Sequence, residues 1–498
     1  MTTTDLPAEP LADAAPRHVV SAYADDALGE LDATGVAAAI KRGDISAYEA
    51  ADAAVRRIEA VEPALRATVR TTYSSGFDRA AELDQQTSQR LASGLSGEDD
   101  PRSFLGVPTV IKDNVDLAGH PTQHGSHAFR AKAATSSEGV VRQLLETGVV
   151  VLAKTTLPEY GFNASTESAR GATRNPWHTE HTPGGSSGGS AALVAAGAVP
   201  LAHGNDGGGS IRIPAACCGL VGLKTTRGRE ASGRAARGLP VDIVANGVIT
   251  RTVRDTAAWV AALDGQQRDG SLPDVGLVDS PGPRRRIGLV LDAPGADPTD
   301  PETRAAVEQT AELLEELGHE VVAVDPPVDE AYGEAFLTYW STLAWGVQHG
   351  GRLVTGHRFD GKATEQLTKT LSREMRRRWL KLPGALRTLR RSHEAYAQAI
   401  APVDAVLSPT LSHPAPPLGF LGPDQPAQQQ LDRLVQWATF TPANNGSGAP
   451  GISLPLGATE AGLPIGIHLS GAHGEERTLL ELAVELEDAR PFRRIQDL

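Results

Sequence analysis

The stretch Gly184-Gly185-Ser186-Ser187-Gly188-Gly189-Ser190 is followed, within the next twenty residues, by Gly207-Gly208-Gly209-Ser210. Glycine adopts positive φ angles without steric penalty and lets bare backbone N–H groups come close to a ligand. Both a phosphate cradle and an oxyanion hole need such a backbone. The two stretches therefore predict tight turns that present Ser186 and Ser210 at a binding or catalytic site.

The phosphate interpretation lacks its remaining residues. A Walker-type loop would end in Gly-Lys-Ser or Gly-Lys-Thr, and a dinucleotide fingerprint would open a helix after the first strand of a βαβ unit. Neither pattern is present in these two stretches. What remains is a pair of serine hydroxyls in a tract of small residues, with Lys112 upstream.

Lys112 ends the apolar run that begins at Phe104, and this run predicts a buried strand with a charge at its C-terminal end. Only eight of the 47 basic residues are lysines. Lysine, unlike arginine, can lose its proton when it is desolvated, so Lys112 is a candidate base. Taken alone, a lysine that extends its amine from the strand end to solvent is the simpler interpretation.

The combination of these segments resembles the amidase signature family of serine hydrolases. The resemblance extends from about residue 31 to about residue 492. The motifs that carry it are Gly184–Ser190, the run from His203 to Ala215, Val221–Lys224, Gly106-Val107-Pro108 with Lys112-Asp113-Asn114, Pro158–Gly161 and Thr173–Trp177.

This resemblance implies an α/β fold with a mixed, twisted central β-sheet covered by helices on both faces. It implies a single domain over residues 26–498, with the signature core at about 100–260 and a variable helical region at about 331–403. Residues 1–25 are expected to form an N-terminal extension prone to disorder. Apolar patterns also predict a strand at 286–291, a helix from Asp300 to Leu317 that stops at Gly318, and a strand at 321–324.

The same resemblance places a Ser-(cis)Ser-Lys triad on three residues. Ser210 would be the nucleophile, Ser186 the bridging serine after a cis peptide bond, and Lys112 the base. Free serine is a weak nucleophile, so a base must take its proton, and Ser186 can relay that proton because a hydroxyl both donates and accepts. Lys112 can receive it only when burial lowers its pKa from about 10.4. Activity is therefore expected to rise toward mildly alkaline pH.

The residues around the nucleophile have supporting roles in this interpretation. The N–H groups of Gly207, Gly208, Gly209 and Ser210 are predicted to form the oxyanion hole. Asp206 and Arg212, which carry opposite charges, are expected to fix the shape of the turn. Ser187 competes for the bridging role, but the spacing of 24 residues to Ser210 matches the family for Ser186.

Other candidate residues are assigned no chemistry. His203 occupies a slot that is not the base in relatives, and Lys154 and Lys224 lack the Asp-Asn pair that follows Lys112. The 14 histidines include no HExxH pair and the two adjacent cysteines form no CxxC motif, which argues against a metal site. Cys217 and Cys218 are expected to pack in the core. No cofactor is expected.

The substrate is less well defined by the sequence. Gly161, Asn163 and Asn205 are predicted to contact it, together with Trp345 or Tyr339 from the helical region. The Asn205-Asp206 pair resembles hydrolases of nylon oligomers more than the A-type chain of glutaminyl-tRNA amidotransferases, which has Gln at the position of Ile213. Gly207 departs from the more usual Thr or Ala. Aryl amides, linear amides and carbamates stay open, as do a component of a transamidating complex and a non-catalytic relative that acts as a binding module.

Composition limits the partners. The net charge of −14 argues against a nucleic-acid surface, and the arginines between Arg373 and Arg391 are expected to form a solvated helix face. The N-terminus lacks the features of a signal peptide, and no apolar run reaches the ~18–20 residues of a membrane span. Adjacent cysteines give no disulfide framework. A cytoplasmic enzyme is expected, and a homodimer by analogy with relatives.

Overall fold

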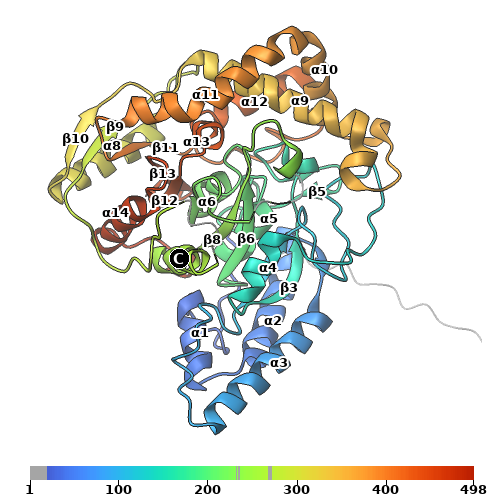
Figure 1. Ribbon diagram of the computed structural model, residues 1–498, viewed down its shortest axis with the longest axis vertical. Coiled ribbons are helices and arrows are strands. Elements are labelled where there is room, and N and C mark those ends of the chain that lie inside the picture. The colour runs from blue at the N-terminus through green and yellow to red at the C-terminus, as the bar shows by residue number, and fades with distance from the viewer. Residues whose placement is uncertain (1–18, 232, 234–235, 267–271, 498) are drawn as a thin grey trace, which may run out of the picture.

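One mixed β-sheet of eleven strands runs through the molecule (Figure 1). The computed structural model describes residues 19–231, 233, 236–266 and 272–497. β2 is parallel to β3 and β6, and β9 is parallel to β10 and β11, while the other pairs are antiparallel. Across the sheet the strands are β1 (Thr68–Thr71), β3 (Val150–Thr155), β2 (Pro108–Lys112), β6 (Leu201–Asp206), β8 (Ala245–Thr250), β7 (Val221–Lys224), β12 (Gly451–Ala458), β13 (Pro464–Gly471), β11 (Ala405–Pro409), β9 (Arg286–Leu289) and β10 (Glu320–Ala323).

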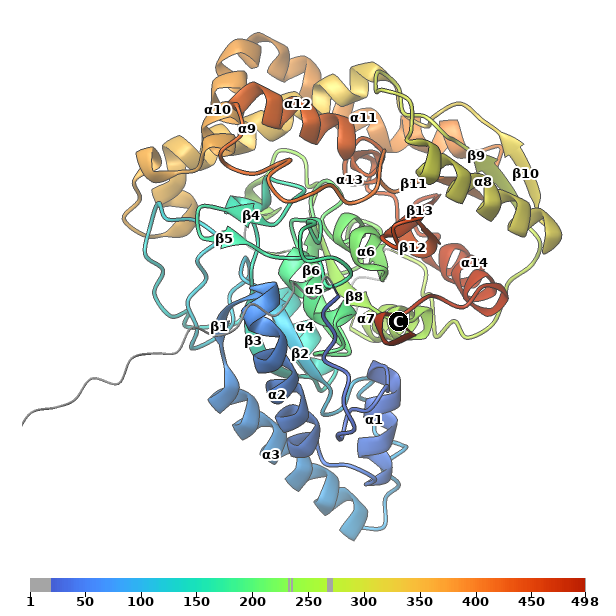
Figure 2. The same cartoon turned by 180° about the vertical axis from the view of Figure 1, so that it is seen from behind.

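Helices cover both faces of this sheet (Figures 1 and 2). On β13, a methyl group added to Gly466 would meet Ala216 of α6, and one added to Gly471 would meet Leu479 of α14. Because successive side chains of a strand alternate between faces, these two helices lie on opposite sides. The helices are α1 (Ala33–Arg42), α2 (Ala47–Leu65), α3 (Tyr73–Ala92), α4 (Gly139–Glu146), α5 (Gly188–Ala195), α6 (Arg212–Cys218), α7 (Val253–Asp264), α8 (Pro301–Glu316), α9 (Glu330–Thr355), α10 (Gln366–Arg378), α11 (Leu382–Ile400), α12 (Ala427–Trp437), α13 (Pro442–Ser447) and α14 (Glu476–Ala489).

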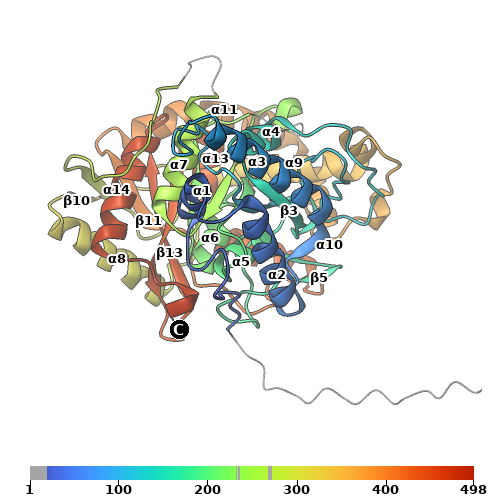
Figure 3. The same cartoon turned by 90° about the horizontal axis from the view of Figure 1, so that it is seen from below.

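Short elements complete the chain. A two-stranded hairpin pairs β4 (Glu167–Ser168) with β5 (Gly171–Ala172), and the 3-10 turns are η1 (Glu159–Gly161), η2 (Ala236–Gly238), η3 (Gly361–Ala363), η4 (Trp379–Lys381) and η5 (Ile495–Asp497). Figure 3 shows α8 and β10 at one end of the molecule and α10 and β5 at the other. The predicted α/β fold, a mixed sheet between helices, is confirmed.

The small-residue tract packs α5 into the centre of the molecule. Every residue of Gly188–Ala195 is buried. A methyl group on Gly189 would lie 2.4 Å from Thr156 Oγ1 and 2.6 Å from the Ala67 carbonyl oxygen. The glycines are therefore needed for close contact as well as for the turn that precedes the helix.

The elements predicted away from the signature core form close to their expected bounds. β9 and β10 match the two predicted strands, and α8 lies between them. Asp300 caps α8 by accepting hydrogen bonds from the N–H groups of Glu302 and Thr303. Gly318 has φ +94, the left-handed conformation expected just after a helix.

The helical region predicted at 331–403 contains the long helices α9, α10 and α11, which lie together at the top of Figure 1. The predicted extension at 1–25 needs a correction at its C-terminal end. The Val20 N–H donates to the Pro176 carbonyl oxygen and the Ala22 N–H donates to that of Ala196, so this part of the chain is already attached to the core. Residues 1–18 of the predicted extension lie outside the described residues.

Candidate functional site

Lys112 lies at the C-terminal end of β2, in the middle of the sheet half formed by β1, β3, β2 and β6. Its side chain is fully buried. Nζ contacts Ser186 Oγ at 2.7 Å and Asn205 Oδ1 at 2.8 Å. Burial lowers the pKa of Lys112 to about 7, although the nearby Asp206 carboxylate opposes the shift. An amine in this environment can exchange protons near neutral pH.

Ser186 and Ser187 follow a cis peptide bond between Gly185 and Ser186, at the predicted place. The two serines have different partners. Ser186 Oγ meets Lys112, whereas Ser187 Oγ donates to the Asn205 carbonyl oxygen and accepts from the Asn205 N–H, both at 3.3 Å. The lysine contact thus distinguishes Ser186 from its neighbour, and Ser187 holds the end of β6.

Ser210 lies in the turn between β6 and α6 and is 9% exposed. Asp206, the last residue of β6, accepts the Gly209 N–H at 2.7 Å and the Ile211 N–H at 3.2 Å. The Gly209 N–H is therefore already used within the protein, which corrects its predicted place among the oxyanion-hole donors. The N–H groups of Gly207, Gly208 and Ser210 remain as candidates.

A buried ion pair fixes the turn that carries Ser210. Arg212 donates from Nε and from one terminal nitrogen to the Asp206 carboxylate, and both side chains are fully buried. Burial alone would raise the pKa of Asp206, but the charge and hydrogen bonds of Arg212 outweigh it and hold that pKa well below its usual value. The supporting roles predicted for Asp206 and Arg212 agree with this geometry.

The C-terminal part of the chain closes this network. Arg212 also donates to the side-chain oxygens of Asn444 and Asn445 on α13. Asn445 Nδ2 donates to the Asp206 carboxylate, and Thr441 Oγ1 donates to the Gly208 carbonyl oxygen at 2.7 Å. Sequence reasoning missed these residues, although the polar run from Thr441 to Asn445 stands between apolar segments and could have drawn attention to them.

The other titratable candidates are occupied or unsuited to act as a base. Burial and the Lys112 charge lower the pKa of His203 to about 3, so its ring is a very weak base. Lys154 pairs with Asp113 at 2.7 Å, and Lys224 donates to the carbonyl oxygens of Thr225 and Ala449. Cys217 and Cys218 are buried thiols, as predicted.

The predicted substrate contacts fall in different places. A methyl group on Gly161 would lie 2.9 Å from Ser186 Oγ, so Gly161 lies beside the bridging serine. Asn205, a predicted substrate contact, accepts a hydrogen bond from the Lys112 amine through its side-chain oxygen and so positions that amine. Asn163 is also bonded within the protein: Nδ2 donates to the Leu421 carbonyl oxygen and Oδ1 accepts the Ser165 N–H.

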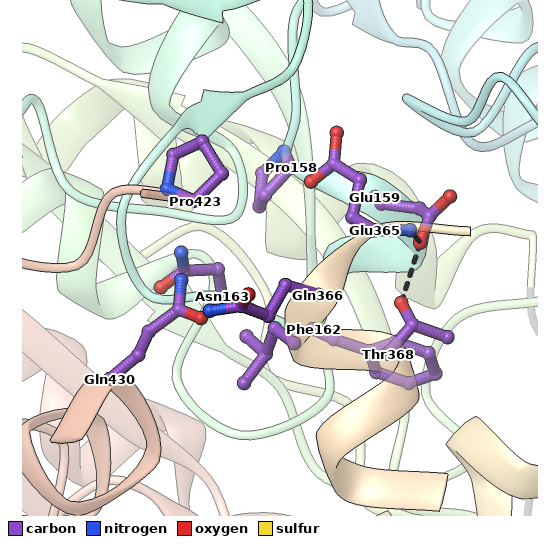
Figure 4. A pocket seen from close by; sticks show the side chains of 10 residues that line it. Pro158, Glu159, Phe162, Asn163, Glu365, Gln366, Thr368, Pro423 and Gln430 are labelled. Carbon is purple, nitrogen blue, oxygen red and sulfur yellow. Dashed lines mark hydrogen bonds between the residues drawn. The ribbon is translucent and has the colours of Figure 1, made fainter. Parts of the chain in front are cut away.

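Asn163 borders a small cavity next to the site (Figure 4). Glu159 lies in the same wall and is tied to α10 through the Glu365 N–H and the Thr368 hydroxyl. The other lining residues flank η1, begin α10, or lie before or within α12; they are Pro158, Phe162, Gln366, Leu367, Pro423 and Gln430.

The aromatic residues predicted from α9 are corrected by the helix geometry. A methyl group on Gly208 would lie 3.6 Å from Cζ of Phe336, so Phe336 closes the space beside the Ser210 turn. Trp345 is nine residues further along, which turns it by about 180° to the other side of the helix. It is 42% exposed and stacks on His349. Tyr339 is buried and its hydroxyl donates to the Val241 carbonyl oxygen.

In the described part of the chain, no helix is both long enough and apolar enough to cross a bilayer.

Known proteins resemble this chain over almost its whole length. The amidase family profile matches residues 49–480. The putative amidase AmiC of Mycobacterium tuberculosis is 45% identical over 478 residues, covering 96% of this chain and 98% of its own. The 6-aminohexanoate-cyclic-dimer hydrolase of Paenarthrobacter ureafaciens is 34% identical, with 93% and 95% coverage. The A-type chain of the glutamyl-tRNA(Gln) amidotransferase of Synechococcus is also 34% identical, with 90% and 94% coverage.

A solved structure of 6-aminohexanoate cyclic dimer hydrolase, complexed with substrate, superposes with a TM-score of 0.80 at 30% identity and covers 94% of this chain and 98% of its own. The profile match and the relatives extend over nearly the whole described fold. The chain belongs to the amidase signature family, and it hydrolyses amide C–N bonds.

Proposed function

We propose that the chain hydrolyses a small-molecule amide or carbamate through an acyl-enzyme formed on Ser210. The observation that carries this proposal is the 2.7 Å contact between Lys112 Nζ and Ser186 Oγ in a fully buried setting. A lysine with a pKa of about 7 is partly neutral at physiological pH and can act as the base. Ser186 links it to the nucleophile.

In the first step Ser210 Oγ attacks the substrate carbonyl carbon. The Ser210 proton passes to Ser186 Oγ, and the Ser186 proton passes to Lys112 Nζ. The tetrahedral intermediate then collapses: the C–N bond breaks, and the leaving nitrogen receives the proton back through Ser186. Water repeats the sequence on the acyl-enzyme and releases the acid; with a carbamate, the product released is a carbonic acid monoester, which loses CO2 to give the alcohol.

The negative charge on the tetrahedral oxygen needs hydrogen-bond donors already in place. The N–H groups of Gly207, Gly208 and Ser210 have this role in our proposal. The Asp206–Arg212 pair and Thr441 hold the backbone that carries these donors.

Nylon oligomers, aryl amides and carbamates are the substrate classes that we favour, and we place the enzyme in the cytoplasm, as a homodimer. A component of a transamidating complex is the second candidate, because the amidotransferase chain is as similar in sequence as the cyclic-dimer hydrolase. Ile213 favours the hydrolase, because the sequence resemblance implies Gln at this position in amidotransferases of this type.

The test compares purified wild type with Ser210→Ala on a p-nitroanilide, 6-aminohexanoate oligomers and an aryl carbamate, without any partner protein. We expect hydrolysis of at least one substrate, loss of that hydrolysis in the variant, and an acyl adduct on Ser210 in the intact mass of the wild type during turnover. Activity that persists in Ser210→Ala would refute the nucleophile. No hydrolysis by the folded wild type would favour the transamidating or binding-only alternatives.

A further inference from the structure

Five aromatic side chains form a connected row beside the candidate site. The row runs from Phe129 to Phe359, then Tyr160, Phe162 and Trp340, with ring centroids 6.1–6.5 Å apart at each step. We call these five residues the aromatic row. Only 4% of the residues in this chain are aromatic, so a row of five drawn from separate segments is a concentrated feature.

The aromatic row lies beside the reacting groups. Tyr160 and Phe162 flank Gly161, whose added methyl group would reach Ser186 Oγ at 2.9 Å. Trp340 is one helical turn from Phe336, the residue that closes the space beside Gly208. The row therefore borders the bridging serine on one side and, through α9, approaches the Ser210 turn on the other.

The backbone at Tyr160 is shaped for this placement. Tyr160 has φ +51 and His124 has φ +52, two of the three non-glycine residues with positive φ among those the structure describes. The His124 ring stacks on Tyr160, and the Tyr160 N–H donates to the His124 carbonyl oxygen at 2.9 Å. A bulky residue adopts this conformation at a cost in free energy, and such residues gather at functional sites.

Packing of α9 onto the core is the alternative explanation, and it accounts for part of the row. Phe129 and Phe162 are buried, as packing residues would be. Tyr160, Trp340 and Phe359 keep part of their surface open. These three side chains pack against the main core and remain half-buried, and an aromatic side chain that is still partly open beside a site can be covered by a flat apolar ligand.

We propose that the aromatic row is a subsite for an aryl group of the substrate, held by stacking and edge contacts. The inference rests on the proposed acyl-enzyme function and narrows its substrate class to amides or carbamates that carry an aromatic ring. The ring can belong to the acyl part or to the leaving amine. These two sources have the same recognition chemistry and are separated by the test.

The test uses two substrate pairs in which one member carries a flat phenyl ring and the other a saturated cyclohexyl ring. N-phenylacetamide and N-cyclohexylacetamide place the ring on the amine side, and N-methylbenzamide and N-methylcyclohexanecarboxamide place it on the acyl side. Each variant is compared with wild type on the same substrate, so differences in leaving-group reactivity cancel. Trp340→Leu is the main variant, Trp340→Phe restores an aromatic ring, and Trp345→Leu, on the opposite side of α9, is the matched control.

We expect Trp340→Leu to raise KM about five- to tenfold for the phenyl member of one pair, because leucine cannot replace the ring contact that tryptophan makes with the substrate ring. The cyclohexyl member should change less than about twofold by the same reasoning. Trp340→Phe should recover most of the loss, and Trp345→Leu should match wild type. If Trp340→Leu does not fold, Phe359→Leu replaces it.

Binding measured without turnover separates this proposal from the one on which it rests. In a Ser210→Ala background, calorimetry should give weaker binding of the phenyl amide when Trp340 is Leu. Equal losses for phenyl and cyclohexyl substrates, or equal behaviour of Trp340→Leu and Trp345→Leu, would refute the aryl subsite even if Ser210-dependent hydrolysis is present. Ring-selective binding without any hydrolysis would support the subsite and refute the acyl-enzyme function.

Discussion

At the level of single residues, the protonation state of Lys112 sets the pH dependence. The base must be neutral, and burial lowers the pKa of Lys112 to about 7. We expect kcat/KM to rise about tenfold per pH unit below this value and to level off above it. A rate that falls steadily between pH 7 and 9 in folded enzyme would rule out Lys112 as the base.

Adjacent serines provide a matched pair of variants. Ser186→Ala removes the hydroxyl that contacts Lys112 and should lower kcat about 10²- to 10⁴-fold, the usual contribution of positioned proton transfer. The Ser187 hydroxyl instead bonds the backbone of Asn205. Ser187→Ala should therefore lower kcat less than about tenfold, because it removes no proton-transfer group. Steady-state kinetics of both variants checks the assignment. Equal losses would contradict it.

The predicted triad positions come from the resemblance to the amidase signature family, which rests on residue types and spacings within short motifs. The sequence could not predict the partner of Asn205, because that side chain meets Lys112 through pairing of two strands, β2 and β6, far apart in the chain. The sequence alone therefore assigns Asn205 to the substrate, whereas in the structure it holds the base.

At the level of elements, the turn between β6 and α6 tolerates side chains unequally. Gly209 has φ +125, and an added methyl group would lie 2.2 Å from Thr441 Oγ1. The same group on Gly207 would be 3.8 Å from Val244, an ordinary contact. We expect Gly209→Ala to lower kcat at least about 10²-fold by misplacing oxyanion donors, and Gly207→Ala to keep kcat within about tenfold of wild type. Similar kinetics for both variants would refute this view of the turn.

The orientation of helix α9 could not be predicted from the periodic pattern of its sequence. The sequence predicts helices in this region and places Trp345 or Tyr339 at the site; the helices are present, but Trp345 is exposed and the Tyr339 hydroxyl is bonded to Val241. Periodicity fixes which residues share a face, but it does not say which face meets the sheet. Phe336 and Trp340, rather than Trp345, lie on the inner face, and this depends on how the helix docks against Gly208 and Phe162.

At the level of the whole molecule, the Ser210 turn depends on residues from the far end of the chain. Arg212 is bonded to Asp206 and also to Asn444 and Asn445, more than 230 residues away. Arg212→Met would leave the Asp206 charge buried and unpaired, and we expect a loss of about 3–5 kcal/mol in unfolding free energy. Urea unfolding followed by fluorescence measures this loss; Arg377→Met, whose side chain is 71% exposed, is the control. A change below about 1 kcal/mol for Arg212→Met would contradict the assignment.

Burial of Lys112 makes it a base near neutral pH, and it also makes the stability of the folded protein depend on pH. Unfolded Lys112 would hold its proton up to about pH 10.4, while the folded residue releases it near pH 7, so the unfolded chain binds the extra proton between these values. Wild-type stability from this residue therefore grows by about 1.36 kcal/mol per pH unit from pH 7 toward pH 10. Lys112→Met has no such dependence, so any stability advantage it has at pH 7 should shrink as pH rises in paired unfolding experiments. Lys112 makes Ser210 reactive. Relative to the inactive Lys112→Met variant, it also makes the folded protein least stable at the acidic end of the pH range in which the enzyme works.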